Sequence, residues 1–90
     1  AARLDPRQPR WQVGQGIVYH NLGQYQKARE AFSAAIRMNP KFADAYYYLG
    51  LLEQESGNPE EARKVLNQAV ELQPGHSEAR KALKDLEQER

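Results

Sequence analysis

The sequence contains no cysteine, which excludes disulfide bonds, thiol nucleophiles and cysteine-ligated zinc. This absence fits a reducing compartment and favours the cytoplasm, although the sequence names no compartment. Long apolar runs are also missing, so neither a membrane-spanning segment nor a signal peptide is visible. Charge of one sign does not dominate, because 13 basic and 12 acidic residues among 90 give a net charge of +1. The chain therefore lacks the electrostatic footprint of a protein that binds nucleic acid or an anionic membrane.

Catalytic and metal-binding constellations are missing as well. His20 and His76 each lack a second metal ligand at helical spacing, and we interpret both as solvated or turn histidines. The serines have no visible base, and the pair Glu60–Glu61 is explained by its place at the start of a predicted helix. No glycine-rich phosphate loop is present. We therefore expect a chain that is not an enzyme and that uses no cofactor or metal.

What the sequence does contain is an internal repeat with a period of 34 residues. Pro6 also lies one period of 34 residues before Pro40, so the repeat extends toward the start of the sequence. We therefore predict that residues 1–8 are the tail of a preceding repeat and that the chain is a piece of a longer array. The recurring pairs are Gly16 with Gly50, Gly23 with Gly57, Ala28 with Ala62, Ala35 with Ala69, Pro40 with Pro74, and Phe32 with Leu66.

Each unit predicts two helices. In the second unit, residues 43–56 contain good helix formers, and Gly57 is expected to end the helix because glycine tolerates positive φ. Asn58 is the expected N-cap of the next helix, which begins at Pro59 and continues to about Leu72. The apolar positions of that helix recur near the helical period of 3.6 residues.

The first unit and the C-terminal segment follow the same rules. Residues 10–22 and 25–38 are predicted helices separated by Gly23. A last helix is predicted over 77–90, with Ser77 as its expected N-cap. Its narrow apolar stripe suits a terminal helix that packs on one side only, and the stripe consists of Ala79, Leu83 and Leu86.

These markers together resemble the tetratricopeptide repeat (TPR), whose pattern is Trp-x-x-Leu-Gly-x-x-Tyr, then Ala-x-x-x-Phe, then Pro. The resemblance implies one all-α domain over 1–90, stacked as a right-handed α-solenoid. It divides the chain into a tail (1–8), two repeats (9–42 and 43–76) and a capping helix (77–90). The matching residues are Tyr19, Gly16, Ala28, Phe32 and Pro40 in the first unit, and Tyr46, Leu49, Gly50, Ala62, Leu66 and Pro74 in the second.

The first unit departs from the family pattern. Gln12 and Gln15 stand where the family has large apolar residues, and Trp11 lies one residue ahead of the usual aromatic. Gly14 adds a second glycine to the helix interior, which costs about 1 kcal/mol relative to alanine. We therefore expect the helix over 10–22 to be the less stable first helix.

In a TPR the first helix of each unit lines a concave groove, and the rotation of about 100° per residue selects the side chains that face it. Of three consecutive tyrosines, Tyr46 is then expected in the core between the helices of its unit, Tyr47 in the groove, and Tyr48 at the groove edge or the neighbouring repeat. An apolar strip of this kind also arises from packing between repeats or against further helices, and the sequence leaves this alternative open. The candidate partner-binding residues are Val13, Ile17, Asn21, Tyr47, Tyr48, Leu51, Gln54 and Lys81.

Some family members grip the C-terminal carboxylate of chaperones with a clamp of lysine, asparagine and arginine. The clamp positions here carry Val13, Ile17, Tyr48, Glu78 and Ala82, which disfavours such a partner. A protein or peptide with apolar side chains, bound extended or as a helix, fits better.

The resemblance therefore implies a non-catalytic protein-interaction module. Two alternatives remain open at this point. The chain could self-associate through open repeat ends, where Leu4 and Trp11 lie, or it could be the docking arm of an enzyme whose catalytic domain lies elsewhere.

Overall fold

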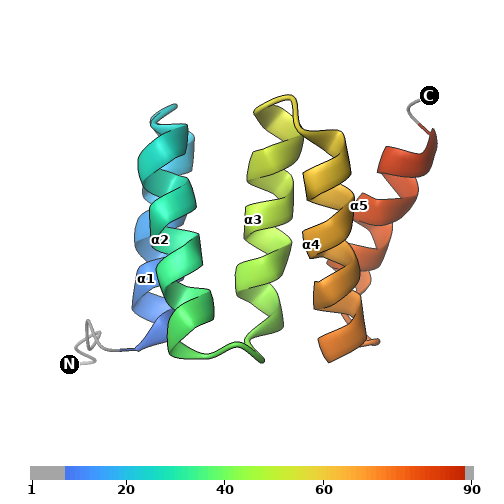
Figure 1. Ribbon diagram of the computed structural model, residues 1–90, viewed down its shortest axis with the longest axis horizontal. Helices are drawn as coiled ribbons and strands as arrows, with labels where there is room; N and C mark the ends of the chain where they lie inside the picture. The colour runs from blue at the N-terminus through green and yellow to red at the C-terminus, as the bar shows by residue number, and fades with distance from the viewer. Residues whose placement is uncertain (1–7, 89–90) are drawn as a thin grey trace.

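Five helices make up the regular structure in the computed structural model, which describes residues 8–88. The helices are α1 (Pro9–Asn21), α2 (Tyr25–Met38), α3 (Ala43–Glu55), α4 (Pro59–Leu72) and α5 (Ser77–Gln88). They form a row in which α1 lies behind α2 at one end and α5 stands at the other end (Figure 1). The predicted helix over Pro59–Leu72 is confirmed, as is the predicted all-α architecture. The predicted tail residues 1–7, including Leu4, and the last two residues of the predicted capping helix lie outside the described residues.

The turns inside the two repeats use one motif. Gly23 and Gly57 have positive φ values of 79° and 86°, as predicted for residues that end a helix. After each glycine the next backbone N–H reaches back to a carbonyl five residues earlier, from Gln24 to Tyr19 at 2.9 Å and from Asn58 to Glu53 at 2.8 Å. These bonds are those of a Schellman motif, which satisfies the free carbonyls at a helix end. The sequence position of the glycine therefore fixes where each helix pair turns.

Within each repeat, a glycine brings the two helices close together. A Cβ atom at Gly16 would lie 2.5 Å from the ring of Phe32, and one at Gly50 would lie 2.5 Å from Cγ of Leu66. Phe32 and Leu66 are fully buried. The recurrence of glycine opposite a large apolar residue therefore reflects packing between helices rather than a turn.

The repeats contact each other most extensively through α2 with α3 and through α4 with α5. α3 contacts both α1 and α5, whereas α2 and α4 do not contact each other in the described part of the chain. Helices that approach each other more closely on one side curve the stack toward that side. The side formed by α1, α3 and α5 is therefore concave, and α2 and α4 form the convex side.

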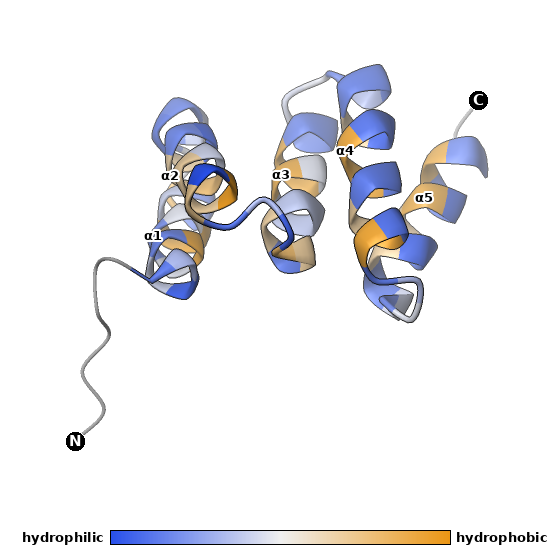
Figure 2. Cartoon of the chain, turned by 60° about the horizontal axis from the view of Figure 1, so that its bottom comes forward, coloured by the Kyte–Doolittle hydropathy of each residue, from blue (hydrophilic) through white to orange (hydrophobic). Residues whose placement is uncertain are grey.

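The core is divided into two apolar clusters. Helices α2, α4 and α5 alternate hydrophilic and hydrophobic positions along their lengths, as expected for helices that bury one face (Figure 2). Tyr46 packs against both clusters but is only half-buried, and its hydroxyl donates to the carbonyl of Pro40 at 3.0 Å. This corrects the prediction of a buried Tyr46, because a phenol needs a polar partner and this one finds it at the turn between repeats. The clusters centre on Phe32, Leu49 and Leu52, and on Leu66, Ala69 and Leu86.

The predicted N-cap position of Asn58 is confirmed, whereas the N-cap predicted at Ser77 is wrong. Asn58 occupies the N-cap position of α4, but its side chain does not cap the helix and instead donates to Oε1 of Glu53 at 3.0 Å. Ser77 is the first residue of α5, and the cap is His76, whose Nδ1 accepts the N–H of Ala79 at 3.1 Å. His76 is 6% exposed and lies in the turn before α5, so of the two interpretations, solvated or turn histidine, the turn histidine is correct.

Candidate partner-binding groove

A pocket of about 320 Å³ lies on the concave side between α3 and α5. Tyr47 and Leu51, one turn apart on α3, line one side of it, and both are half-buried. On α5 the spacings of three, four and seven residues place the other lining side chains on one face. We call this hollow the α3–α5 pocket, and its lining consists of Tyr47, Leu51, Glu78, Lys81, Ala82 and Asp85. Three predicted site residues, Tyr47, Leu51 and Lys81, therefore meet there.

Tyr47 is held in place by two other rings. Its ring centroid lies 5.0 Å from that of Tyr48 and 5.1 Å from that of His76. His76 is itself fixed, because Nδ1 accepts from the backbone of α5 and Nε2 donates to Oδ1 of Asp44 at 2.8 Å. The Tyr47 side chain is thus positioned by a ring of α3 and by a ring from the turn before α5, which reduces the entropy it would lose on binding a partner.

The phenols of Tyr47 and Tyr48 lie in a negative electrostatic environment. Burial is the main cause that raises the pKa of Tyr47, followed by the negative charge of Glu78, with smaller contributions from Tyr48 and Asp44. Burial also raises the pKa of Tyr48, and the charges of Asp44 and Glu78 add to it. Both tyrosines are therefore neutral hydrogen-bonding groups near neutral pH, close to carboxylates of α3 and α5.

The part of the predicted groove near α1 is packed more tightly. Val13 is 6% exposed and belongs to the first apolar cluster, against which Ile17 and Tyr48 also pack. The ring of Tyr48 stacks on that of Phe32, with centroids 6.0 Å apart and an interplanar angle of 15°. Val13 therefore keeps little surface accessible in the groove and packs in a cluster to which both repeats contribute. Ile17 and Tyr48 are half-buried and keep part of their surface available.

At the far end of the groove, α1 and α3 are joined by polar side chains. His20 Nε2 contacts Oε2 of Glu55, and the His20 side chain is 16% exposed. His20 is therefore tied between repeats instead of solvated, which corrects the sequence interpretation. Asn21 is exposed beside it, and Gln54 is half-buried. These two predicted site residues lie near the carboxyl ends of α1 and α3 and do not line the α3–α5 pocket.

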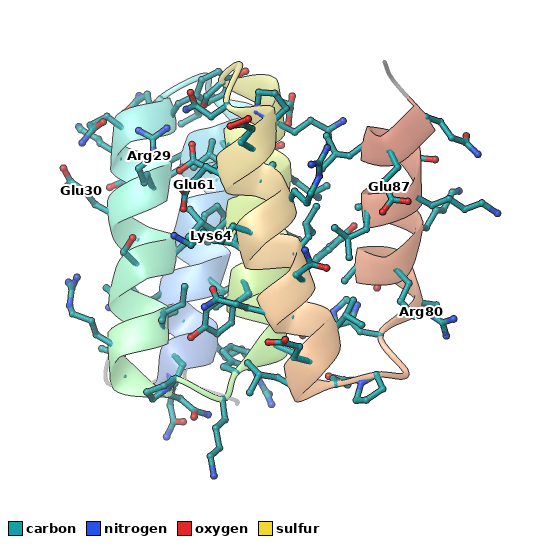
Figure 3. All side chains as sticks on the ribbon, turned by 45° about the vertical axis from the view of Figure 1, so that its right-hand side comes forward. Arg29, Glu30, Glu61, Lys64, Arg80 and Glu87 are labelled. Atoms are coloured by element: carbon teal, nitrogen blue, oxygen red, sulfur yellow. The ribbon has the colours of Figure 1, made fainter. Side chains whose placement is uncertain are left out.

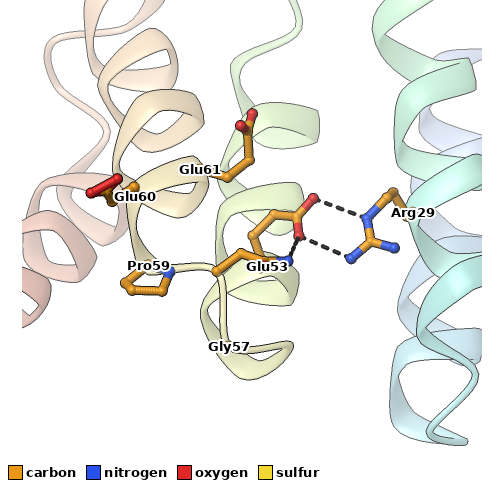
Figure 4. Close-up of a pocket in the computed structure, with 7 residues that line it drawn as sticks. Arg29, Glu53, Gly57, Pro59, Glu60 and Glu61 are labelled. Carbon is orange, nitrogen blue, oxygen red and sulfur yellow. Dashed lines mark hydrogen bonds and ion pairs between the residues drawn. The ribbon is translucent and has the colours of Figure 1, made fainter.

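The sequence did not indicate a second, larger hollow on the other side of α3. It measures about 830 Å³ and lies between α2, the end of α3 and the start of α4 (Figure 4). Inside it, Arg29 donates two parallel hydrogen bonds of 2.9 Å to Glu53, from Nε to Oε2 and from Nη2 to Oε1. The hydrogen bonds from Arg29, and secondarily from Asn58, hold the pKa of Glu53 below its ordinary value, although burial opposes them.

This ion pair joins the two repeats, because Arg29 belongs to the first and Glu53 to the second. A signal for it was present, since Glu53 stands where the family pattern has tyrosine and where the first unit has Tyr19. The partner could not be read from one sequence, because Arg29 lies 24 residues away on another helix. Other charged side chains, such as Glu30 and Arg80, project outward from α2 and α5 (Figure 3). We interpret the Arg29–Glu53 pair as a fixed link between repeats.

Residues 8–88 contain no group of three or more histidine, aspartate or glutamate side chains arranged to hold a metal ion. None of the described helices is both long enough and apolar enough to cross a membrane.

The sequence matches a family model described as tetratricopeptide repeat, over residues 1–35 and 13–77. The chain belongs to the tetratricopeptide repeat family. No curated protein matches it closely enough to count as a relative. Solved structures do resemble this TPR chain, which spans between 45% and 67% of the length of the three described next.

The first TPR domain of human RPAP3 superimposes with a TM-score of 0.87 at 26% identity, and the alignment covers 93% of this chain and 66% of that one. The first TPR of Spaghetti (RPAP3), bound to the HSP90 peptide SRMEEVD, gives a TM-score of 0.85 at 26% identity and covers 93% and 67%. The MamA protein gives 0.83 at 26% identity and covers 92% and 45%. The TPR α-solenoid predicted from the sequence is therefore confirmed.

Proposed function

We propose that this TPR chain is a non-catalytic protein-interaction module that binds a peptide or helix of a partner protein on its concave side. The observation that carries the proposal is the α3–α5 pocket, where the aromatic and aliphatic surfaces of Tyr47 and Leu51 remain accessible in a hollow with charged edges. An apolar anchor site with a polar rim is the usual composition of a protein-binding surface. The peptide bound by the first TPR of Spaghetti (RPAP3) supports the same class of function.

The partner segment is expected to carry an apolar side chain that enters the pocket, where Tyr47 and Leu51 contact it. Ile17 and Tyr48 extend the apolar surface toward α1, and Asn21 supplies an exposed amide at the end of the groove. The clamp positions Val13, Ile17 and Ala82 are apolar, so we do not expect this chain to grip a C-terminal carboxylate as clamp-type TPRs do. An internal segment of a partner is the expected ligand.

The test is a selection of random linear peptides displayed on phage, carried out against the intact chain. Peptides that bind the wild type should lose at least about tenfold in affinity for Tyr47→Ala/Leu51→Ala, because truncated hot-spot residues each cost roughly 1–2 kcal/mol. A matched control is Met38→Ala/Leu72→Ala, which removes two exposed apolar side chains from α2 and α4 and should leave binding unchanged. Equal loss in both variants, or none in the first, would show that the concave groove is not the binding site. Circular dichroism checks that each variant stays helical.

A second candidate function is self-association through the outer surface of α1. Val18 and Leu22, one turn apart at the end of this helix, are 56% and 64% exposed. In an array of repeats such a surface would meet a neighbouring unit. Sedimentation velocity should then show dimers that Val18→Gln/Leu22→Gln abolishes, while a wild-type chain that remains monomeric at high concentration would exclude this function.

A further inference from the structure

The charges around the α3–α5 pocket are not balanced, unlike those of the whole chain. Glu78 and Asp85 border the pocket, and Lys81 is the basic residue among its lining side chains. Asp44 lies close enough for its charge to raise the pKa of both Tyr47 and Tyr48. Two carboxylates and one ammonium group therefore border the apolar surface of the pocket, and a third carboxylate, that of Asp44, acts on the charge state of Tyr47 beside it.

These carboxylates retain their capacity for charge pairing. Glu78 and Asp85 are exposed, and neither forms an ion pair with another group in the described part of the chain. Asp44 accepts one hydrogen bond from His76 through Oδ1 while its side chain is 51% exposed. The negative potential of the pocket is thus not neutralised by the fold, apart from the contribution of Lys81.

The charge at one position of the repeat changes sign along the groove. The position that carries Glu78 on α5 and Asp44 on α3 carries Arg10 on α1, one repeat earlier. Arg10 is exposed. A partner that lies along the groove therefore meets carboxylates at α3 and α5 and a guanidinium group at α1, which favours one orientation of a partner with charge at one end.

We propose that the α3–α5 pocket selects a basic partner segment, in which a large apolar side chain is flanked by lysine or arginine. This inference rests on the proposed function and adds the chemical class of the partner. The apolar side chain enters over Tyr47 and Leu51. The flanking cations pair with Glu78 and Asp85. Lys81 repels positive charge, so it disfavours segments that carry more cations than these carboxylates can pair with. An acidic segment is repelled by the same carboxylates.

The same phage selection tests the inference through the composition of the selected peptides. Peptides that depend on Tyr47 and Leu51 should be enriched in lysine or arginine beside an aromatic or long aliphatic residue. Their affinity should fall as the salt concentration rises, because exposed charge pairs are screened. Acidic or uncharged peptides that still require Tyr47 and Leu51 would overturn the basic specificity while leaving the proposed function intact. Selected peptides that are insensitive to both residues would overturn both.

Variants that change charge without changing shape make the test sharper. Glu78→Gln/Asp85→Asn should weaken a selected basic peptide about threefold to tenfold, as expected for the loss of two exposed charge pairs. Glu71→Gln/Glu87→Gln removes the same charge from exposed positions outside the pocket and should leave affinity unchanged within about twofold. Equal losses in the two variants would mean that only net charge matters, which contradicts the inference.

A third variant should act in the opposite direction. Lys81→Met removes the ammonium group at the pocket and should strengthen the same peptide about twofold to threefold. A purely structural role of these side chains would not produce opposite effects at Glu78 and Lys81. Tighter or unchanged binding in Glu78→Gln/Asp85→Asn, or weaker binding in Lys81→Met, would overturn the inference. Urea unfolding of each variant establishes that the chain remains folded at the temperature of the titration.

Discussion

The two helix pairs of this TPR chain consist of helices of the same lengths, 13 and 14 residues, but they make different contacts with the rest of the chain. Both place glycine against a large apolar residue, Gly16 against Phe32 and Gly50 against Leu66. Three residues after each glycine, the first pair has Tyr19 and the second has Glu53. Tyr19 packs on the first apolar cluster, whereas Glu53 is 6% exposed and paired with Arg29. The positions that set the distance between helices are thus shared, and the neighbouring positions differ.

The junctions after the two pairs differ in the same way. Phe42 precedes α3 and provides no side-chain cap, while its equivalent His76 caps α5 and reaches Asp44. The second junction therefore depends on polar groups from three places in the chain. Such a network favours one packing of the junction only while each of its polar groups has a hydrogen-bond partner. A buried polar group without a partner lowers the stability of the fold.

The largest expected effect comes from filling the space between paired helices. Gly16→Ala and Gly50→Ala should each destabilise the chain by about 1–3 kcal/mol, because the new methyl group overlaps a fully buried side chain. Urea unfolding followed by far-UV circular dichroism measures the loss. We expect the larger loss at Gly16, since the flat ring of Phe32 adapts less readily than the branched end of Leu66.

Gly14 provides the control for this comparison, because a Cβ atom there meets nothing within 4 Å. Gly14→Ala should stabilise α1 by about 0.5–1 kcal/mol through helix propensity alone. This variant also tests the expectation that α1 is the less stable first helix. Destabilisation of all three variants to a similar extent would mean that helix packing does not distinguish these glycines.

The next effect concerns the polar link that the second repeat has and the first lacks. Glu53→Gln should cost about 1–2 kcal/mol at neutral pH, because the Arg29 guanidinium loses a charged acceptor in a largely buried place. Since the pKa of Glu53 lies below its ordinary value near 4.5, the stability from this carboxylate is present above that pH. It is lost as the pH falls through the lowered pKa.

Urea unfolding at a series of pH values measures this contribution. The difference between wild type and Glu53→Gln should shrink as the solution is acidified. Glu60→Gln, which removes an exposed carboxylate lining the same hollow, should change stability by no more than about 0.5 kcal/mol at any pH. A difference at Glu53 that does not vary with pH would show that the charge is not the source of its effect.

The smallest of the three effects tests whether His76 or Ser77 caps α5. His76→Ala should cost about 1 kcal/mol and should accelerate amide hydrogen exchange in the first turn of α5, because the N–H of Ala79 loses its acceptor. Ser77→Ala should leave both quantities nearly unchanged. Faster exchange only in the serine variant would restore Ser77 as the cap.

The helix positions were predictable because their signals are local. The helix over Pro59–Leu72 and the positive φ of Gly57 follow from proline at a helix start and glycine at its end. The meeting of Tyr47, Leu51 and Lys81 was predictable from helical rotation combined with the family's stacking. The burial of Val13 was not, because rotation about one helix axis places a residue on a face but does not say how closely the next helix approaches.

The sequence by itself determined the period of 34 residues, the helices, the turns and the membership of the TPR family. These depend on residue types at fixed separations along the chain. Only the tertiary structure decided that Glu53 pairs with Arg29, that His76 caps α5, and that Val13 is buried. These contacts join residues on different helices, and their geometry depends on how the repeats stack against one another.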